Sequence, residues 1–213
     1  MKNWNTSQYW EKRFSVGDTP WDLSGATPLL EYGLSVIERL PVATRSMKKV
    51  LCPGAGRGGD AIGLVRKGYE VIAVDWSETA VAHMRTVSKA ILEKLVDNLH
   101  IYHADFFALR PQRVDIVFEH TFYCAIDPKQ RVDYVERVSQ WLGVGGVLFG
   151  NFFVKSSEGA IHSERNSPPF FSSEQDLRQC FASKFRCLSL APVLDDAAGR
   201  RGDFEWLGIF ERT

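Results

Sequence analysis

Short apolar runs rich in β-branched residues alternate with longer amphipathic stretches along much of the chain. Runs of this kind are typical of buried strands, and the stretches of helical period between them are typical of crossover helices. The runs predict strands at residues 48–52, 70–75, 99–105, 114–119 and 147–153, with a final pair near 186–190 and 204–210.

A glycine-rich turn joins the first predicted strand to a helix. The turn covers residues 53–60, and the helical pattern at 61–68 ends on Gly68, which suits a helix C-cap. Strand, turn, helix and the following strand at 70–75 form one βαβ unit. Because such crossovers connect parallel strands, the sequence predicts a parallel sheet.

Two more helices are expected between the later strands. Ser77 is suited to cap a helix through 80–96, and Pro128 stands in the first turn of a helix that reaches about Leu142, before a turn at Gly145–Gly146. We therefore predict an α/β fold: a Rossmann-like, seven-stranded, mostly parallel sheet with flanking helices and an antiparallel C-terminal strand pair. We find no repeat or linker, so residues 1–213 are expected to form a single domain.

Composition narrows the functional classes. Lys and Arg together number 26, as do Asp and Glu, so no global positive field favours nucleic acid or an acidic membrane surface as partner. The N-terminus lacks a secretory signal pattern and no apolar stretch approaches a membrane span, so a cytoplasmic protein is expected. The four cysteines are scattered without metal-ligand spacing, which predicts reduced thiols and no metal site.

The candidate chemistry lies where predicted strands end, since ligands of open α/β sheets bind there. Gly54 and Gly56 allow a ligand to approach the backbone after the first strand. Asp75 ends the second strand and is suited to accept both hydroxyls of a ribose. Asp105 and Phe106 end the third, where an acid and an aromatic wall suit an adenine. In this order, the three features predict a nucleoside cofactor.

The glycine pattern alone does not decide which cofactor binds. Gly54, Gly56 and Gly59 also match the turn that binds the pyrophosphate of NAD. The acid at Asp105, the short chain and the aromatic N-terminus favour S-adenosylmethionine, because aromatic faces attract its sulfonium cation.

Five segments carry a family resemblance. YWEKRF at 9–14 and TPWDLSGATP at 19–28 resemble the N-terminal signature of the thiopurine S-methyltransferase family, especially its halide/thiol methyltransferase branch. CPGAGRG at 52–58, FEHTFYCAI at 118–126 and SPPF at 167–170 are similar to that branch's glycine loop, post-strand segment and Pro-Pro-aromatic loop. The resemblance extends through nearly the whole chain.

The resemblance implies roles for particular residues. Residues 1–30 are expected to form an aromatic-rich lid over the cofactor. The implied cofactor site consists of Trp10, Phe14, Trp21, Gly54, Gly56, Asp75, Trp76, Asp105, Phe106, Glu119 and His120. The implied substrate pocket consists of Trp21, Tyr123 and Phe170, and the catalytic candidates are His120 and Asp22. The chain departs from the family at His120, where Arg or Tyr is usual, and at Phe14, where Trp is common.

The implied activity is methyl transfer from S-adenosylmethionine to a small-molecule thiol, leaving S-adenosylhomocysteine, with His120 as the candidate base and the protein a monomer. Alternatives on the same cofactor site are O-, N-, halide or tellurite methylation. A non-catalytic nucleotide-binding protein and a nucleic-acid methyltransferase are less favoured. From the residues alone, the N-terminal aromatics also suit a packed amphipathic helix, His120 a hydrogen-bonded strand end, and Cys124 a buried hydrophobe.

Overall fold

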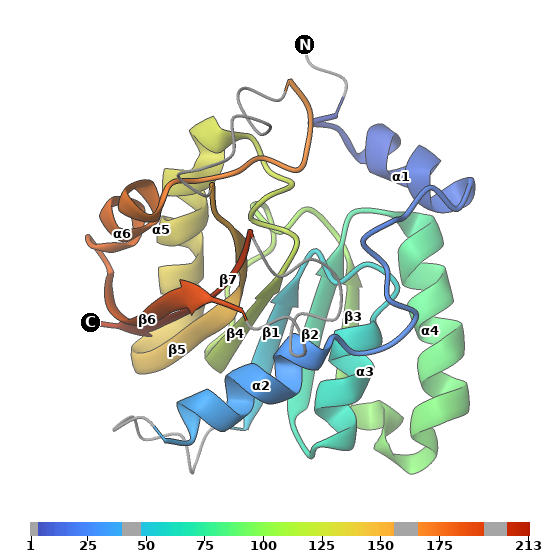
Figure 1. The fold of residues 1–213 in the computed structure, drawn as a ribbon. Coiled ribbons are helices and arrows are strands. Elements are labelled where there is room, and N and C mark those ends of the chain that lie inside the picture. Colours follow the sequence, from blue (N-terminus) through green and yellow to red (C-terminus); the bar gives the residue numbers. More distant parts are fainter. Residues whose placement is uncertain (1–3, 40–47, 156–165, 194–203) are drawn as a thin grey trace.

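A computed structural model describes residues 4–39, 48–155, 166–193 and 204–213. Its centre is a seven-stranded sheet in the order β3-β2-β1-β4-β5-β7-β6 (Figure 1). The strands are β1 (Lys49–Pro53), β2 (Glu70–Asp75), β3 (Leu99–His103), β4 (Val114–His120), β5 (Leu142–Phe153), β6 (Phe185–Pro192) and β7 (Glu205–Arg212). Neighbouring strands pair in parallel except that β7 is antiparallel to both β5 and β6. The predicted α/β fold is confirmed.

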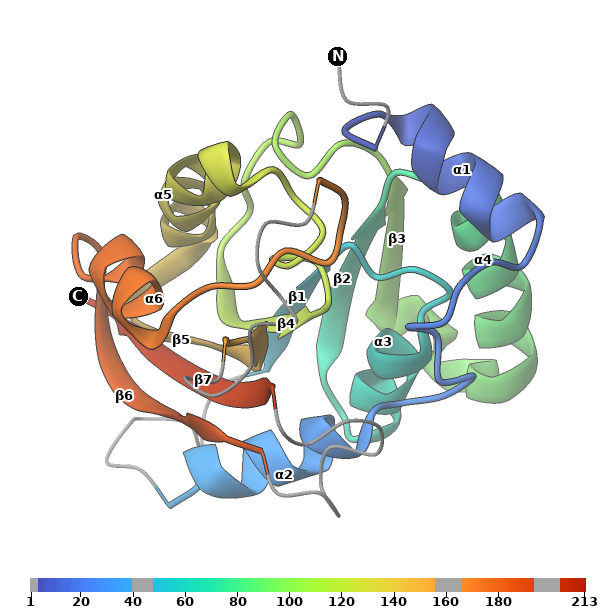
Figure 2. The same ribbon diagram turned by 45° about the horizontal axis from the view of Figure 1, so that its top comes forward.

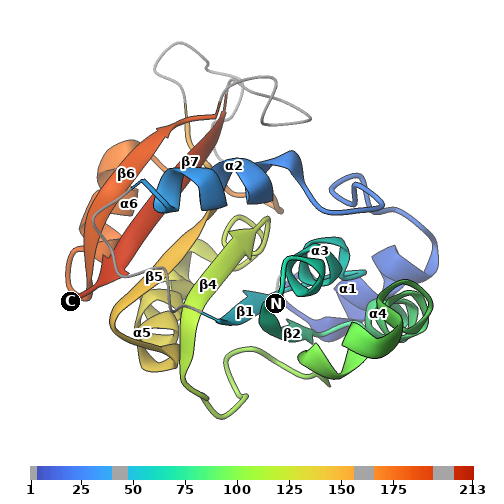
Figure 3. The ribbon, with the colours of Figure 1, turned by 90° about the horizontal axis from the view of Figure 1, so that it is seen from below.

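Helices cover both faces of the sheet (Figure 3). The helices α2 (Pro28–Ile37), α3 (Gly59–Arg66) and α4 (Glu78–Leu92) contribute to one apolar cluster. The helices α5 (Arg131–Trp141) and α6 (Glu174–Phe181) contribute to a second cluster on the opposite face. Each cluster buries the apolar side of the adjoining strands, which is why the central strands read as nearly continuous hydrophobic runs.

The N-terminal helix α1 (Ser7–Ser15) lies apart from these layers. It contacts α4 near the end of the sheet at which β1, β2 and β3 finish, as Figures 1 and 2 show. Thr6 caps α1, since its side chain accepts a hydrogen bond from the backbone N–H of Tyr9. The segment from Trp4 to Thr27 therefore covers the carboxyl ends of the parallel strands.

Several helix boundaries follow local capping signals. Ser77 caps α4 as predicted, accepting from the backbone N–H of Ala80. The helix predicted through 80–96 ends at Leu92, because Glu93 has a positive φ of 49° and a 3₁₀ turn follows. The helices α2 and α6 were not predicted, although Thr27 and Ser173 cap them in the usual way.

The turn predicted at Gly145–Gly146 lies inside β5. That strand starts at Leu142, opposite Val114, and its next pairing joins Val147 to Ile116. The residues between these pairings bulge away from β4, with Gly145 at a φ of +80°. The glycines thus produce an irregularity within one long strand.

Candidate functional site

The site lies at the central pair of strands, β1 and β4, where the sheet order reverses. Chain connections leave these two strands in opposite directions, so their carboxyl ends border a crevice. A cavity of about 260 Å³ occupies this place. The N-terminal segment, the glycine turn, the ends of β2 and β4, and Pro168 line it.

The glycine turn after β1 has a backbone that few other residues adopt. Gly54 has a φ of +59°, and a Cβ at this position would lie 2.4 Å from the ring of Phe122. Several of the turn's own amides are engaged within the protein. The N–H groups of Ala55 and Gly58 donate to the carbonyls of Val74 and Ala55 at 2.9 Å each.

Asp75 ties the glycine turn to the end of β2. The side chain is buried and accepts hydrogen bonds from the backbone N–H of Gly56 at 2.7 Å and of Ser77 at 2.8 Å. Burial raises the pKa of this carboxyl, and the backbone hydrogen bonds oppose that shift. The carboxylate lines the cavity, as does the neighbouring Trp76.

Asp105 and Phe106 line the cavity beyond the end of β3. Asp105 Oδ1 accepts from the backbone N–H of Phe107 at 2.9 Å, which fixes the turn. The Phe106 ring is buried and meets the Phe122 ring edge-on at 5.6 Å. Phe122 therefore touches both the aromatic wall and the glycine turn.

Three aromatic residues of the N-terminal segment line the cavity from the opposite side. The Trp21 ring lies 5.6 Å from that of Trp10 and 6.0 Å from that of Phe14, both edge-on. The Arg13 guanidinium stacks over Trp21 at 4.3 Å. This arrangement packs the helix on the protein and puts its aromatic rings, named here the aromatic cover, in the wall of the cavity.

Glu11 attaches α1 to the start of α4, a contact that the sequence analysis did not predict. Its carboxylate accepts from Ser77 Oγ at 2.6 Å, from the backbone N–H of Thr79 at 3.1 Å, and from the Thr79 hydroxyl. Burial raises the pKa of Glu11, but these hydrogen bonds outweigh it and lower the pKa below the ordinary glutamate value.

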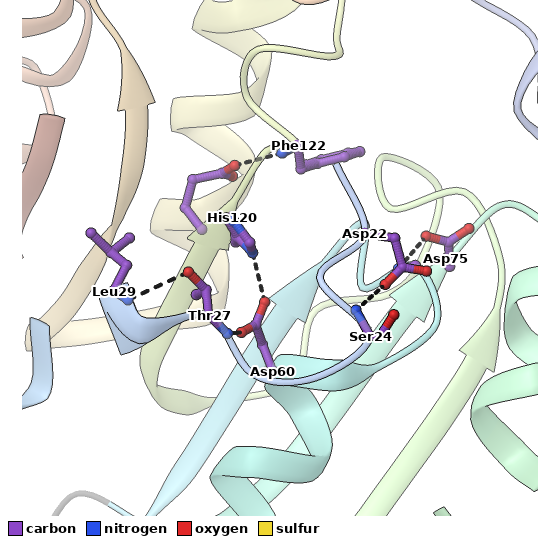
Figure 4. A network of polar contacts seen from close by, with 10 residues as sticks. Asp22, Ser24, Thr27, Leu29, Asp60, Asp75, His120 and Phe122 are labelled. Atoms are coloured by element: carbon purple, nitrogen blue, oxygen red, sulfur yellow. Dashed lines mark hydrogen bonds and ion pairs between the residues drawn. The ribbon is translucent and has the colours of Figure 1, made fainter. Parts of the chain in front are cut away.

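Arg57 connects the glycine turn to the N-terminal segment. Its guanidinium donates to Asp22 Oδ2 at 3.0 Å, to Thr19 Oγ1 at 3.3 Å and to the carbonyl of Phe14 at 3.4 Å. The other oxygen of Asp22 accepts from the backbone N–H of Ser24 at 3.0 Å, as Figure 4 shows. Both oxygens of Asp22, a predicted catalytic residue, thus have protein partners, and these contacts support a positioning role.

His120, at the end of β4, lines the cavity beside a second acidic residue. Its Nδ1 lies 2.7 Å from Asp60 Oδ2, and Asp60 Oδ1 accepts from the backbone N–H of Thr27 at 2.7 Å (Figure 4). Both side chains are mostly buried, at 12% and 18% exposure. Asp60 was missed because its only sequence signal is a place in the first turn of α3.

Glu119, predicted to bind the cofactor, lies outside the cavity wall. Alternation along β4 turns its side chain to the opposite face of the sheet from His120. Glu119 Oε1 accepts from the backbone N–H groups of Phe122 and Tyr123 at 2.8 Å each, and Oε2 accepts from the Tyr134 hydroxyl at 2.6 Å. Burial raises the pKa of Glu119 to about 7.

The structure also places Tyr123 and Phe170, both predicted for the substrate pocket, behind the wall. Tyr123 is buried against Tyr134, with ring centroids 5.3 Å apart. Phe170 is buried against Trp4 at 4.8 Å, and the indole N–H of Trp4 donates to the carbonyl of Asn166 at 2.9 Å. Both residues support the segments that line the cavity.

Part of the remaining wall, named the acceptor wall after the role proposed for it below, is largely apolar. It comprises Phe118, His120, Cys124, Phe153, Pro168, Pro169, Phe204 and Glu205. Burial raises the pKa of the nearby Cys52 thiol well above its usual range, so that thiol stays protonated. Within the described residues, no three His, Cys, Asp or Glu side chains gather as metal ligands would.

Comparisons with known proteins agree with this architecture. A family model described as Thiopurine S-methyltransferase matches residues 5–206. The "Probable thiol methyltransferase 2" of Arabidopsis thaliana is 29% identical over 213 residues, covering 98% of this chain and 87% of that protein. The "Thiocyanate methyltransferase 1" of the same plant is 27% identical over 140 residues, covering 65% and 58%.

A solved structure shares the fold. The 1,6-didemethyltoxoflavin-N1-methyltransferase of Burkholderia thailandensis, solved with S-adenosylhomocysteine, superposes with a TM-score of 0.74 at 20% identity. The match covers 97% of this chain and 87% of that one. No helix in the described parts of the chain has both the length and the apolar composition needed to cross a membrane.

Proposed function

The chain belongs to the thiopurine S-methyltransferase family, and from that premise we propose that it methylates a small thiol or thiolate-like acceptor. It is an S-adenosylmethionine-dependent methyltransferase with the class I fold. The residues that bind the cofactor and the acceptor are part of the proposal, as is the identity of the acceptor.

The family match distinguishes this cofactor from NAD. The glycine turn alone does not: the amides of Ala55, Gly56 and Gly58 donate to protein oxygens at 2.9, 2.7 and 2.9 Å, but no side chain caps the N-terminus of α3. A helix N-terminus of this kind also suits a diphosphate. The match to the thiopurine S-methyltransferase family over residues 5–206 therefore carries the assignment of S-adenosylmethionine.

The cavity residues fit this cofactor. The Gly54 backbone lines the cavity, and the Asp75 carboxylate suits the hydroxyls of a ribose. Asp105 and Phe106 suit the adenine. The rings of Trp10, Phe14, Trp21 and Trp76 suit the sulfonium, through attraction of a cation to aromatic faces.

When bound, S-adenosylmethionine supplies an electrophilic methyl group, which the acceptor sulfur takes with a lone pair as the bond to the departing sulfur breaks. The protein's part is to align the acceptor and to exclude water. The aromatic cover over the cavity serves the second task. His120 is the proposed acceptor of the thiol proton, because it is the histidine among the lining residues and stands on the acceptor wall.

The charges of the acceptor wall favour an acceptor that arrives uncharged. In the described chain, the cations that line the cavity are Arg13 and Arg57, which pair with Asp18 and Asp22 in and near the N-terminal segment. Halides, thiocyanate and oxyanions such as tellurite are therefore less suited than a thiol.

Calorimetric titration with S-adenosylhomocysteine and NAD, followed by an acceptor panel of thiols, iodide, thiocyanate and tellurite, tests the proposal. We expect micromolar binding of S-adenosylhomocysteine alone and fastest turnover with apolar thiols. Preference for NAD would refute the cofactor assignment, and faster turnover of the anions would refute the acceptor class.

The proposal extends to the state in which the protein acts. We propose a cytoplasmic monomer, built as one domain with residues 1–30 as its lid and acting on small molecules rather than nucleic acid. The balance of 26 basic and 26 acidic residues supports this choice of partner. Light scattering and a nucleic-acid binding assay at low salt test both points.

A further inference from the structure

The contact between His120 and Asp60 decides which ring nitrogen of the histidine carries a proton. An ionised carboxylate only accepts hydrogen bonds, so His120 Nδ1 must donate to Asp60 Oδ2 across their 2.7 Å separation. In the neutral ring the lone pair then belongs to Nε2. The described residues provide no hydrogen-bond partner for that nitrogen.

We propose that Asp60 is a positioning residue, which holds His120 as the Nδ1–H tautomer so that Nε2 removes the proton of an uncharged thiol. This inference rests on the proposed function. The S–H bond of the acceptor breaks, its electron pair stays on sulfur, and the proton binds Nε2. The resulting thiolate takes the methyl group, and the imidazolium, stabilised by Asp60, later releases its proton to solvent.

Asp60 is itself held in place from two sides. It lies in the first turn of α3, where the helix N-terminus stabilises a negative charge. Its second oxygen accepts from the backbone N–H of Thr27 at 2.7 Å. Gly59 permits this approach, since a Cβ there would lie 2.2 Å from the carbonyl oxygen of Gly25. The carboxylate therefore has little freedom to leave the histidine.

The charges around the pair are consistent with this assignment. Glu119 is adjacent along β4 but points to the other face and bonds Tyr134. The Cys52 thiol is buried, and burial, Asp60 and Glu119 all raise its pKa, so it stays protonated. The Arg57 guanidinium is engaged by Asp22.

Asp60→Asn is the decisive variant because it keeps the shape of the side chain and replaces the hydrogen-bond acceptor that faces His120 by a donor. Its amide oxygen still accepts from Thr27, whereas its NH₂ group donates to His120 Nδ1 and forces the proton onto Nε2. The analogous change in serine protease triads, where the wrong tautomer forms, costs about 10⁴-fold in turnover.

Nitrogen NMR of the ligand-free protein reads the tautomer without any turnover. We expect Nδ1–H for His120 in the wild type and Nε2–H in D60N, with His120→Gln identifying the signal among the five histidines. An Nε2–H ring in the wild type, or the same tautomer in both proteins, would overturn the proposal.

Two acceptors separate base catalysis from general damage. An alkyl thiol such as phenylmethanethiol needs deprotonation, whereas pentafluorothiophenol is already a thiolate at neutral pH. We expect D60N to lower kcat for the alkyl thiol by about 100-fold, within the usual range for a general base, and to change kcat for the aryl thiolate by less than about threefold. Equal losses with both acceptors would overturn the proposal. If D60N does not fold, H120Q tests the base by the same comparison, and the tautomer of His120 in the wild type tests the role of Asp60.

Asp115→Asn is the matched control. Asp115 also accepts two backbone hydrogen bonds, from Lys48 at 2.9 Å and Lys49 at 3.0 Å, at the opposite end of β1. We expect equal kcat for both acceptors in this variant. If the wild type methylates neither thiol, the proposed function is refuted. If the wild type methylates both thiols and D60N changes kcat equally for the two, only the role of Asp60 is refuted.

Discussion

The two halves of the cavity differ in how far apart their residues stand along the chain. The proposed cofactor half is built from consecutive strand ends between Gly54 and Phe106. The proposed acceptor half combines the end of β4 with residues near Pro168 and Phe204, and the N-terminal segment also lines the cavity. The first half is therefore fixed by local turns and parallel strands. The second depends on contacts between segments distant in sequence, so the two should respond differently to substitution.

The largest expected effect is in the cofactor half, at Asp75. Asp75→Ala removes a buried acceptor, and a hydrogen bond to a charged group contributes about 1.5–3 kcal/mol. With two ribose hydroxyls, we expect S-adenosylhomocysteine affinity to fall by about 10³-fold in calorimetry. Asp75→Asn should lose less, because its amide oxygen still accepts. Unchanged S-adenosylhomocysteine affinity in D75A would show that Asp75 does not belong to the cofactor half.

The next effect concerns Glu119, which lies behind the acceptor half. Burial raises its pKa to about 7 from 4.5, so between these values the folded protein keeps a proton that the unfolded chain has lost. The free energy of unfolding therefore falls as pH rises through this window, by up to about 3 kcal/mol above pH 7. Glu119→Gln lacks this titration.

Urea unfolding of both proteins at several pH values measures that effect. The wild type should lose stability relative to E119Q from pH 4.5 to 7, with a constant difference above pH 8. Parallel curves across the range would contradict a raised pKa for the buried carboxyl.

A smaller effect is expected where the two halves touch, at Gly54 and Phe122. Gly54→Ala places a Cβ 2.4 Å from the Phe122 ring at a φ of +59°. Gly68→Ala is its control, because Gly68 also has a positive φ, +91°, with nothing within 4 Å of the added Cβ. We expect G68A to cost about 1 kcal/mol and G54A about 2 kcal/mol more, in thermal unfolding. Equal losses of stability in G54A and G68A would mean that the Phe122 ring moves away from the added Cβ without strain.

The smallest effect is expected at the attachment of α1. Glu11→Gln removes the charge that accepts from Ser77 and Thr79 on α4. We expect S-adenosylhomocysteine affinity to fall by about tenfold, with little change in unfolding, because the aromatic cover is held less firmly. Glu78→Gln, an exposed glutamate at the start of the same helix, should bind like the wild type. Equal affinity in E11Q would show that the cover closes without this attachment.

Local patterns explain why the fold, and the gathering of the strand-end residues at one cavity, were predictable. Gly54, Asp75 and Asp105 each follow an apolar strand, and parallel strands bring their ends to one edge of the sheet. The antiparallel final strand was predicted from its position alone. By contrast, α2 and α6 were missed because their short amphipathic patterns lie between less regular segments.

The acceptor half was predicted less well, for physical reasons. Glu119 and His120 are adjacent, and the sequence does not say which one faces the cavity; strand alternation sends Glu119 to the far side. Asp60 meets His120 across 60 positions of sequence, a distance that no local motif spans. Tyr123 and Phe170 stand in segments that reach the cavity, but their side chains are buried behind the cavity wall and pack those segments against the protein.

The aromatic cover has an optical consequence. Of the six tryptophans, Trp10, Trp21 and Trp76 line the cavity, whereas Trp141, the last residue of α5, is fully buried in the core. Indole emission responds to the polarity around the ring, so a ligand that fills the cavity should shift the emission of the first three and leave that of Trp141 constant. The protein thus carries its own fluorescent reporter of ligand entry, and stopped-flow mixing could time that entry without any attached dye.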